Sequence, residues 1–472
     1  MNPASRHDEP KESCGVFGIF LPGADVSRLV YLSLFALQHR GQESAGIASS
    51  NGEAIVLKKD LGLVAQVFDE WALAVLKGDL AIGHTRYSTM GSTRWENAQP
   101  TFRRLDSAQF ALGHNGNLTN TSELAVELGT QLASTDTDLM AEAIVEAYTA
   151  AEGKGGIAAA IAASVPRFEG AFSLVIMDQE RIVGVRDRHG FRPLCLGRLD
   201  HGWVLASETA ALDVIGAEFV REVEPGEMAV IDRGGVHSSR PLGKAHPSLC
   251  VLEFVYFSRP DSVLNGTNVH LARRRMGEVL ATEAPVDADV VVPVPESGVP
   301  AAQGYAVASG IPYSDGMVKN RYVGRTFIEP DQVDRDRAIR MKLNPMPSTL
   351  VGRRVVLVDD SIIRGTTTRQ LVDVVRASGA TEVHLRVSSP PYRWPCFYGM
   401  DTPDRAHLLA AERSVAEIQD FLGADSLGYL SLEGLLEATG TGSGGMCTAC
   451  FSGNYPTPVP INADKLLLER SE

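Results

Sequence analysis

The sequence predicts two domains of different class, an α+β domain followed by an α/β domain built on a parallel sheet. Residues 15–240 contain many short apolar runs bounded by Gly, Asp or Asn, which are typical of β-strands, and only a few helical patterns interrupt them. Beyond residue 245, strand and helix patterns alternate along the chain. The strands of this second part are apolar throughout, as expected for a parallel sheet that is buried on both faces.

The predicted strands of the first domain begin with "GVFGIF" at residues 15–20 and end with "EMAVID" at residues 227–232. Helical patterns lie at residues 27–39, 122–129 and 136–151. The last of these opens in "STDTD", whose hydroxyl and carboxylate side chains can cap a helix N-terminus. Many strands combined with few helices predict a layered α+β domain.

The composition changes in the polar stretch 238–248, where we expect the border between the domains. The second domain then offers three apolar strands, "ADVVVPVP" (288–295), "RRVVLVDD" (353–360) and "EVHLRVSS" (382–389). Helical patterns separate the strands, so each pair reads as a βαβ unit.

Composition and charge exclude several classes of function. The chain has 472 residues, with 44 Lys and Arg against 58 Asp and Glu, so the net charge is 44 − 58 = −14. An acidic chain is a poor general binder of nucleic acids or anionic membranes, and an anionic substrate must be held by a local basic cluster. No apolar run is long enough to span a bilayer, and the N-terminus lacks the apolar segment of a secretory signal. We therefore expect a cytoplasmic protein.

The sharpest motif is "VVLVDDSIIRGTTTRQL" at residues 355–371. Its apolar strand ends in Asp359 and Asp360, at the edge where parallel sheets bind ligands. A loop rich in Gly and hydroxyl groups follows and opens a helix at about Thr368. Backbone N–H groups at such an opening suit a phosphate, while the two acids suit ribose hydroxyls and Mg²⁺. The motif therefore predicts a sugar-phosphate site.

This motif resembles the phosphoribosyl-diphosphate signature of type I phosphoribosyltransferases, and "VPVPESGVPAA" (292–302) resembles their pyrophosphate loop. The resemblance implies a phosphoribosyltransferase domain over residues 245–460. Residues 319–342 carry seven basic and four acidic side chains, and we interpret them as a flap that closes over the diphosphate, although a solvated charged loop is the alternative. The implied Mg²⁺ positions are Ser297, Asp359 and Asp360, and the implied substrate positions are Lys319, Arg325, Asp359, Asp360, Gly365, Thr366 and Thr367.

Four motifs are spread over the first domain: "LQHRGQES" (37–44), "HTRYST" (84–89), "GHNGNL" (113–118) and "STDTD" (134–138). Together they resemble class II glutamine amidotransferases, whose N-terminal nucleophile domain begins at a cysteine. The corresponding cysteine here is Cys14, directly before "GVFGIF". The resemblance implies an αββα sandwich over residues 14–240.

Elementary chemistry explains why the domain would begin at Cys14. A thiol with a pKa of about 8.5 is only slightly ionised at neutral pH, so it needs a neighbouring base. An α-amine with a pKa of about 7.7–8.0 can serve as that base, whereas an amide nitrogen inside a chain cannot. We therefore expect residues 1–13 to form a propeptide that is removed by cleavage between Ser13 and Cys14.

The same resemblance assigns roles to matched positions of the first domain. Asn115 and the Gly116 backbone N–H would form the oxyanion hole beside the nucleophile Cys14. Arg86 would bind the glutamine carboxylate, since a guanidinium can do so through two hydrogen bonds, and Asp138 would bind the glutamine ammonium. Arg40 is left open between a supporting or interface role and a surface ion pair.

Cys447 and Cys450 form a C-x-x-C pair, which could be zinc-binding, redox-active or accidental. Cys250 and Cys396 can complete a set of four thiolates. Four thiolates suit either Zn²⁺ or an iron–sulfur cluster, and spacing does not decide between them. "CTACFSGNYP" (447–456) resembles the C-terminal motif of the iron–sulfur subgroup of the glutamine phosphoribosylpyrophosphate amidotransferases, which also carries a short propeptide. The resemblance implies a [4Fe–4S] cluster, structural or oxygen-sensing. Cys195 lies outside this set, and we expect it to pack in the core.

From Cys14 to about residue 460 the chain resembles this family, the amidophosphoribosyltransferases. The resemblance implies that glutamine, phosphoribosyl diphosphate and water yield phosphoribosylamine, glutamate and pyrophosphate, the first committed step of purine synthesis. It also implies one Mg²⁺ and one cluster per subunit, a homotetramer, and feedback inhibition by purine nucleotides.

Two alternatives are considered. Other enzymes of the glutamine amidotransferase class carry a sugar-isomerase or ATP-pyrophosphatase domain, which "VVLVDDSIIRGTT" disfavours. A ligand-sensing or RNA-binding regulator without catalysis is disfavoured by the intact set of glutaminase residues and by the acidic charge balance.

Overall fold

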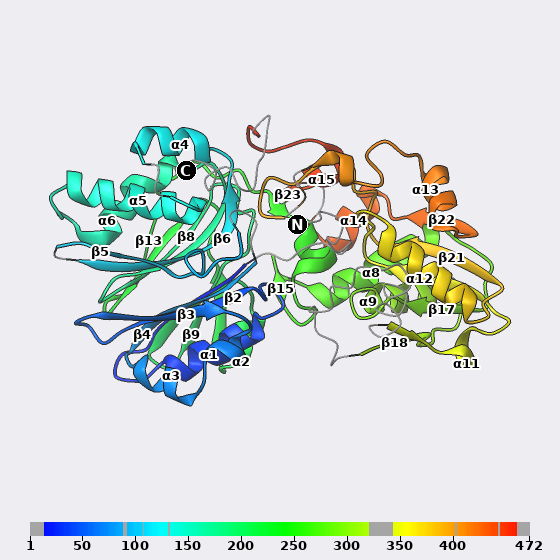
Figure 1. The fold of residues 1–472 in the computed structure, drawn as a ribbon, viewed down its shortest axis with the longest axis horizontal. Helices are drawn as coiled ribbons and strands as arrows, with labels where there is room; N and C mark the ends of the chain where they lie inside the picture. Colours follow the sequence, from blue (N-terminus) through cyan, green and yellow to red (C-terminus); the bar gives the residue numbers. More distant parts are fainter. Residues whose placement is uncertain are drawn as a thin grey trace.

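The computed structural model describes residues 14–87, 92–106, 108–130, 133–320, 343–400, 402, 404–441 and 444–459. Two domains of different architecture lie side by side (Figure 1). The first is built from two stacked antiparallel sheets, and the second surrounds a smaller parallel sheet. The predicted fold class, α+β followed by α/β, is therefore confirmed.

The two sheets of the first domain form the inner layers of an αββα sandwich. One sheet has the strand order β11-β9-β10-β1-β4-β2-β3, and the other has the order β13-β12-β8-β7-β6-β5. The first sheet comprises β1 (Gly15–Phe20), β2 (Ser44–Ser50), β3 (Ile55–Leu61), β4 (Leu80–Arg86), β9 (Cys195–Leu199), β10 (Gly202–Ala206) and β11 (Glu218–Glu222). The second comprises β5 (Thr101–Arg104), β6 (Gln109–Leu118), β7 (Gly170–Met177), β8 (Ile182–Arg186), β12 (Met228–Asp232) and β13 (Gly235–Ser239).

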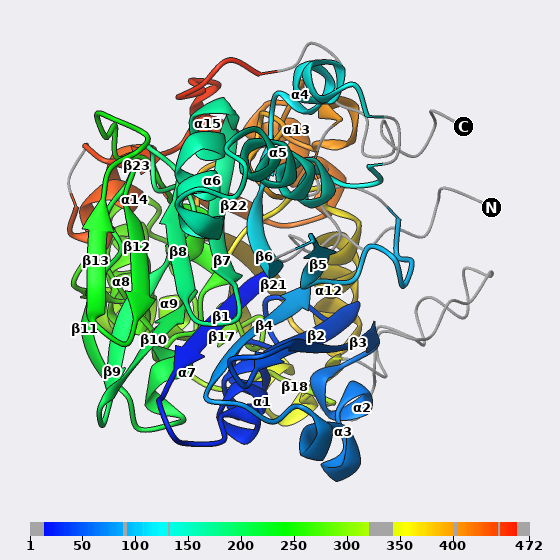
Figure 2. The ribbon, with the colours of Figure 1, turned by 90° about the vertical axis from the view of Figure 1, so that its left-hand side faces the viewer.

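Helices cover the outer face of each sheet, as Figures 1 and 2 show from two directions. On the first sheet lie α1 (Ser27–Ala36), α2 (Val64–Val67), α3 (Glu70–Val75) and α7 (Ala210–Asp213); on the second lie α4 (Thr121–Leu128), α5 (Asp136–Ala150) and α6 (Gly156–Ser164). A separate apolar core fills the space between the sheets, with Val16, Ile82 and Val175 fully buried in it. The strand β1 is buried along its whole length because it has an apolar layer on each face.

The helix predicted at residues 136–151 is observed as α5, and its start follows the expected capping chemistry. Thr135 accepts a hydrogen bond from the backbone N–H of Asp138, so it caps the helix. The helix predicted at residues 27–39 ends earlier, at Ala36, and Leu37 to Arg40 continue as turns. Apolar periodicity runs past this end because Leu37 is also buried in the core.

The second domain is organised around a parallel sheet with the order β17-β20-β21-β22. Its strands are β17 (Val290–Pro293), β20 (Arg354–Asp359), β21 (Glu382–Val387) and β22 (Ser426–Tyr429). The surrounding helices are α8 (Val269–Glu283), α9 (Val299–Ser309), α11 (Pro347–Leu350), α12 (Thr366–Ala377), α13 (Val415–Leu422) and α14 (Leu432–Thr439). Val290, Val355 and Val383 on neighbouring strands are buried in one apolar cluster, as predicted for a sheet covered on both faces.

Short elements complete the second domain near its border with the first. The short strand β14 (Leu249–Cys250) pairs in parallel with β23 (Met446–Cys447), which leads into the turn of helix α15 (Ala449–Ser452). A π-helical turn, η3 (Glu253–Phe257), follows β14. The hairpin of β15 (Val263–Leu264) and β16 (Thr267–Asn268) comes next in the chain. Farther from the border, β18 (Met317–Lys319) pairs with β19 (Leu343–Pro345), and a short 3₁₀ helix, η4, covers Arg405–His407 (Figure 1).

Candidate functional site

Cys14 lies directly before β1, at the edge of the sheet where β4 also ends. Gly15 pairs with Thr85 of β4, so Cys14 comes next to Arg86 and Tyr87. The thiol donates a hydrogen bond to the Tyr87 carbonyl at 3.3 Å, and Cys14 is buried. The predicted nucleophile is therefore held by the sheet itself. The predicted propeptide, residues 1–13, lies outside the described residues.

The surroundings of Cys14 make it a weak nucleophile without a base. Burial raises the pKa of the Cys14 thiol above its usual value, and the hydrogen bond to Tyr87 and the charge of Arg86 only partly offset this rise. A buried thiol of this kind stays protonated at neutral pH and needs a group that takes its proton. This requirement agrees with the expected role of a free α-amine at Cys14.

Both polar side-chain atoms of Asn115 are buried without a hydrogen-bond partner among the described residues. The residue lies in β6 and is fully buried. Buried amides are nearly always hydrogen-bonded, so this side chain is poised for a group that the described protein does not supply. It fits the predicted oxyanion hole.

Gly116, the second predicted member of the oxyanion hole, follows in β6 with a φ of +147°. A Cβ at this position would lie 2.0 Å from the Ala171 carbonyl oxygen, so no other residue fits. This close approach fixes the backbone beside Asn115.

Hydrogen bonds connect residues 114–118 of β6 to helix α5. The His114 backbone N–H donates to Gln99, at 2.8 Å, and the Gln99 amide donates to Thr137, at 3.0 Å. The Leu118 N–H donates to the Asp136 carboxylate at 3.2 Å. Burial opposes ionisation of Asp136, but the charge of nearby His114 and these hydrogen bonds lower its pKa overall. The first turn of α5 therefore fixes β6, and with it the amide of Asn115.

The residues predicted to bind glutamine lie at the same end of the domain. Arg86 is the last residue of β4, and its side chain is 3% exposed, 4.0 Å from the Glu43 carboxylate. Asp138 lies in the first turn of α5, accepts from the Ser134 hydroxyl at 3.0 Å, and pairs with Arg103 at 3.2 Å. The Asp138 side chain is 17% exposed, so its carboxylate is held in a defined position and is still accessible to solvent.

Arg40 is a buried interface residue, and the alternative of a surface ion pair is wrong. Its side chain is 0% exposed and bonds to two carboxylates, Glu208 of the first domain and Glu253 of the second. Its Nε donates to the Cys14 carbonyl oxygen at 3.1 Å. The sequence analysis did not identify Glu208 or Glu253. The available signal was weak: each is an acidic residue within a largely apolar stretch, "VLASETAAL" (204–212) and "VLEFVYF" (251–257).

The two acids of the second domain lie where the sequence places them. Asp359 ends β20 and Asp360 follows it, and both residues are buried. Helix α12 begins at Thr366, two residues before the expected start at Thr368, and Gly365 precedes it with a φ of +79° that suits glycine. Thr366 and Thr367 therefore lie in the first helical turn, where backbone N–H groups point out of the helix.

The predicted pyrophosphate loop adjoins these acids. Strands β17 and β20 pair in parallel, and the backbone N–H of Val294 donates to the Val358 carbonyl at 2.8 Å. The half-buried Ser297 follows in the turn that leads to α9. Both loops thus leave the same edge of the sheet, as expected for a site at the carboxyl ends of parallel strands.

The predicted flap is described only at its base. Lys319 is exposed at the end of β18 and pairs with Leu343, the first residue of β19. Residues 321–342, including Arg325, lie outside the described residues. The two ends of this basic segment therefore start from adjacent strands, close to each other.

Four cysteines from three segments gather near the border of the domains. Cys250 and Cys447 are register partners in β14 and β23, while the Cys450 carbonyl accepts from the backbone N–H of Arg393 and of Trp394, both at 3.0 Å. Burial and the thiols of Cys250, Cys396 and Cys447 raise the pKa of Cys450 well above its usual value. All four are free thiols, so the donor set fits a thiolate-bound centre.

Within the described parts of the chain, no three His, Cys, Asp or Glu side chains are grouped as ligands of a single ion. The donor set of four thiols suits either Zn²⁺ or an iron–sulfur cluster.

Cys195 packs in the core, as predicted. It lies in β9 among the apolar residues under α1 and α7, and its thiol donates to the Ala206 carbonyl at 3.3 Å. Burial raises the pKa of this thiol, which disfavours the reactive thiolate.

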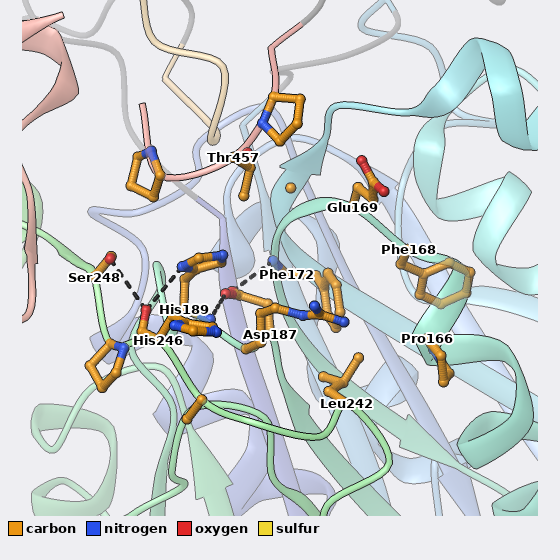
Figure 3. Close-up of a pocket in the computed structure, with 16 residues that line it drawn as sticks. Pro166, Phe168, Glu169, Phe172, Asp187, His189, Leu242, His246, Ser248 and Thr457 are labelled. Atoms are coloured by element: carbon orange, nitrogen blue, oxygen red, sulfur yellow. Dashed lines mark hydrogen bonds between the residues drawn. The ribbon is translucent and has the colours of Figure 1, made fainter. Parts of the chain in front are cut away.

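A separate cavity of about 680 Å³ lies beside the start of β7 and is lined by the first domain and by residues 456–458 of the C-terminal segment (Figure 3). The His189 Nδ1–H donates to the His246 carbonyl oxygen, 2.9 Å away, and the Asp187 carboxylate accepts from the backbone N–H groups of Phe172 and His189. Burial raises the pKa of Asp187 to about 6. None of the residues predicted for catalysis lines this cavity.

Among the described helices, none has the length and apolar character needed to cross a membrane.

Comparison with known proteins agrees with this geometry. Residues 84–214 match the glutamine amidotransferase domain family, and residues 263–389 match the phosphoribosyl transferase domain family. The chain is 52% identical to an amidophosphoribosyltransferase of Synechococcus elongatus, covering 98% of this chain and 96% of the relative. It is 46% identical to the amidophosphoribosyltransferase of Bacillus subtilis, over 95% of each.

A solved glutamine phosphoribosylpyrophosphate amidotransferase from Bacillus subtilis, complexed with ADP and GMP, superposes with a TM-score of 0.89. It shares 45% sequence identity and covers 96% of this chain and 99% of its own. A structure described as the allosteric regulatory enzyme of purine biosynthesis gives a TM-score of 0.90 at 45% identity, over 96% and 98% of the two chains. The chain belongs to the amidophosphoribosyltransferase family, the enzymes that convert phosphoribosyl diphosphate and glutamine to phosphoribosylamine in the first step of purine biosynthesis.

Proposed function

We propose that this reaction begins at Cys14, after cleavage of the Ser13–Cys14 peptide bond. The freed α-amine takes the proton of the Cys14 thiol, and the sulfur attacks the side-chain carbonyl carbon of glutamine. The proton then passes to the leaving nitrogen, which departs as ammonia and leaves a glutamyl thioester. Water hydrolyses the thioester and releases glutamate.

The observation that carries this proposal is the unpartnered amide of Asn115. Attack on the glutamine carbonyl places negative charge on its oxygen, and a donor that is already aimed at this oxygen stabilises the transition state. Asn115 has a buried N–H₂ group without a partner among the described residues, fixed by a strand that α5 holds in place. With the Gly116 backbone N–H, it supplies the oxyanion hole.

Arg86 and Asp138 hold the amino-acid end of glutamine in this proposal. The Arg86 guanidinium binds the α-carboxylate and Asp138 binds the α-ammonium. The side chain of Asp138 is already fixed by Ser134 and Arg103, which supports a preorganised site.

The second domain binds phosphoribosyl diphosphate and Mg²⁺ in this proposal. Asp359 and Asp360 contact the ribose hydroxyls, and Gly365, Thr366 and Thr367 bind the 5′-phosphate at the start of α12. Ser297 would hold Mg²⁺ together with the two acids, and the ion supplies charge neutralisation at the departing pyrophosphate. Lys319 and Arg325 belong to the flap that excludes water. Ammonia passes inside the protein and attacks C1 of the ribose.

We further propose that Cys250, Cys396, Cys447 and Cys450 hold one [4Fe–4S] cluster per subunit. The support is the set of four free thiols around the β14–β23 pair. A centre at this place joins the start of the second domain to its last described elements, which suits a structural or oxygen-sensing role.

Regulation by nucleotides follows the solved relatives in this proposal. The relative from Bacillus subtilis was solved in complex with ADP and GMP, and the other solved structure is described as an allosteric regulatory enzyme. We therefore propose feedback inhibition by purine nucleotides. We also propose a cytoplasmic homotetramer, which the resemblance of the sequence to the family implies.

The experiment that tests the nucleophile is Cys14→Ala, assayed with glutamine and with ammonia as nitrogen donors. The variant should lose glutamine-dependent synthesis and keep ammonia-dependent synthesis, because only the first domain is disabled. Cys195→Ala is the matched control, since it removes another buried thiol of the same domain and should keep both activities. Retained turnover of glutamine by Cys14→Ala would show that another group attacks the amide.

A further inference from the structure

A chain of buried charged side chains reaches from the second domain to the backbone of Cys14. Arg40 uses all three nitrogens of its guanidinium in this chain. Its Nη1 donates to Glu208 at 2.5 Å, its Nη2 donates to Glu253 at 2.8 Å, and its Nε donates to the Cys14 carbonyl at 3.1 Å. Because a guanidinium is a rigid planar fork, the two carboxylates set the direction in which the Nε–H points.

Glu253 is the fixed end of this chain. It opens the π-helical turn η3, and its carboxylate also accepts from the Ser258 hydroxyl at 2.7 Å and from Arg192 at 3.1 Å. Arg192 donates through its Nε to the Tyr398 carbonyl at 3.0 Å, on the segment that carries Cys396. The side chains of Arg40, Glu253 and Arg192 are all 0% exposed. Because these partners lie in both domains, the position of Glu253 depends on how the domains pack.

Cys14 has a particular need for such support. Once residues 1–13 are removed, the residue is joined to the chain only through Gly15, and its own backbone no longer continues on the other side. Besides the thiol, which bonds to the Tyr87 carbonyl, its carbonyl oxygen is then a polar group through which the protein can fix its orientation. Arg40 holds that oxygen, so a displacement of Arg40 moves both the sulfur and the α-amine relative to Asn115.

We propose that Glu253 is a positioning residue for amide hydrolysis, acting through Arg40 across the border between the domains. The proposal rests on the nucleophilic role of Cys14 proposed above and adds that the second domain supplies part of the support of the first site. A change in η3 therefore alters amide hydrolysis without touching glutamine. Arg86 and Asp138 bind the substrate independently of Glu253, so the effect falls on the rate of attack rather than on binding.

The test is Glu253→Gln in the full chain, which keeps the size of the side chain but removes its charge. We expect kcat with glutamine to fall about 10- to 100-fold, as for a misplaced reacting group, while KM for glutamine and the ammonia-dependent rate stay unchanged. Arg40→Ala should show the same defect. The double variant should be no worse than either single variant, because both changes break one connection.

Two further variants keep the outcome decisive. Neutralising a buried carboxylate can destabilise a protein, so Glu253→Asp, which keeps the charge but shortens the reach, decides the matter if Glu253→Gln does not fold. Glu222→Gln is the matched control: Glu222 pairs with Arg186 at 3.1 Å and accepts from the second-domain Asn265 N–H at 2.5 Å. This control should keep both activities.

Normal kcat with glutamine in a folded Glu253 variant, or equal loss of both activities, would overturn the proposal. So would additive defects in the double variant with Arg40→Ala. These results leave the role of Cys14 intact as long as Cys14→Ala loses glutamine-dependent turnover. If Cys14→Ala instead keeps that turnover, the nucleophile assignment itself fails, whatever Glu253 does.

Discussion

At the scale of single residues, the Asn115 amide, which has no partner among the described residues, is explained by function rather than by stability. Leaving a buried polar group without a partner costs roughly 1–3 kcal/mol of folding free energy. A residue selected for stability would not be kept in this state. Asn115 is instead suited to a partner that exists only while the amide bond of glutamine is being cleaved.

Asn115→Ala should therefore lower glutamine-dependent kcat by about 10²–10³, the usual effect of losing one oxyanion donor. The ammonia-dependent rate and the melting temperature should be preserved, because the lost group has no partner among the described residues of the folded protein. Steady-state kinetics with both nitrogen donors and a thermal melt check this result. A variant that melts early and loses both activities equally would mean that Asn115 is structural.

Single residues also mark how far the sequence could be interpreted. Asp359 could be predicted because its motif has a chemistry of its own, whereas Cys14 and Asn115 could be predicted only because the motifs of the first domain resemble a known family. Glu253 could not, because its partner Arg40 is 213 positions away and no local pattern links them. A charged residue in an apolar stretch indicates that a partner exists but does not identify it.

At the scale of elements, the strand–loop–helix unit around Asp359 was largely predictable. The apolar strand, the two acids and the glycine-rich loop lie in the expected order. This order is usual because parallel sheets bind ligands at the carboxyl ends of their strands. The start of α12 was misplaced by two residues. Three consecutive Thr residues give a weak helical signal, while the place of Gly365 before the helix depends on its positive φ.

Asp359→Asn should lose both glutamine-dependent and ammonia-dependent synthesis. The two routes share the phosphoribosyl site, and an amide cannot replace a carboxylate toward Mg²⁺ and the ribose hydroxyls. Hydrolysis of glutamine in the absence of synthesis can be followed separately and should persist at its basal level. Full ammonia-dependent synthesis in this variant would exclude Asp359 from the metal and ribose site.

At the scale of the whole molecule, the cysteines join distant parts of the chain. Cys250 follows the domain border, while Cys447 and Cys450 lie near the last described residue. The order of the two domains could be predicted from the alternation of strands and helices. Their packing could not, because it depends on contacts such as Arg40 with Glu253 that join residues without any common motif.

Anaerobic preparations should be brown, with broad absorbance near about 400 nm from thiolate-bound iron–sulfur. Cys250→Ser should lose both colour and iron, and its melting temperature should fall because the centre links β14 to the C-terminal elements. Metal analysis of the two proteins provides the measurement. A colourless wild-type protein that contains stoichiometric zinc would contradict the cluster.

The central claim is that the working enzyme begins at Cys14, and intact-mass spectrometry of active protein tests it most directly. Active material should have the mass of residues 14–472, with no population that retains Ser13. A Ser13→Pro variant, in which cleavage before Cys14 is hindered, should keep the leader and show ammonia-dependent synthesis only. Full glutamine-dependent activity in protein that still carries residues 1–13 would contradict the account, since the nitrogen of Cys14 would then be an amide.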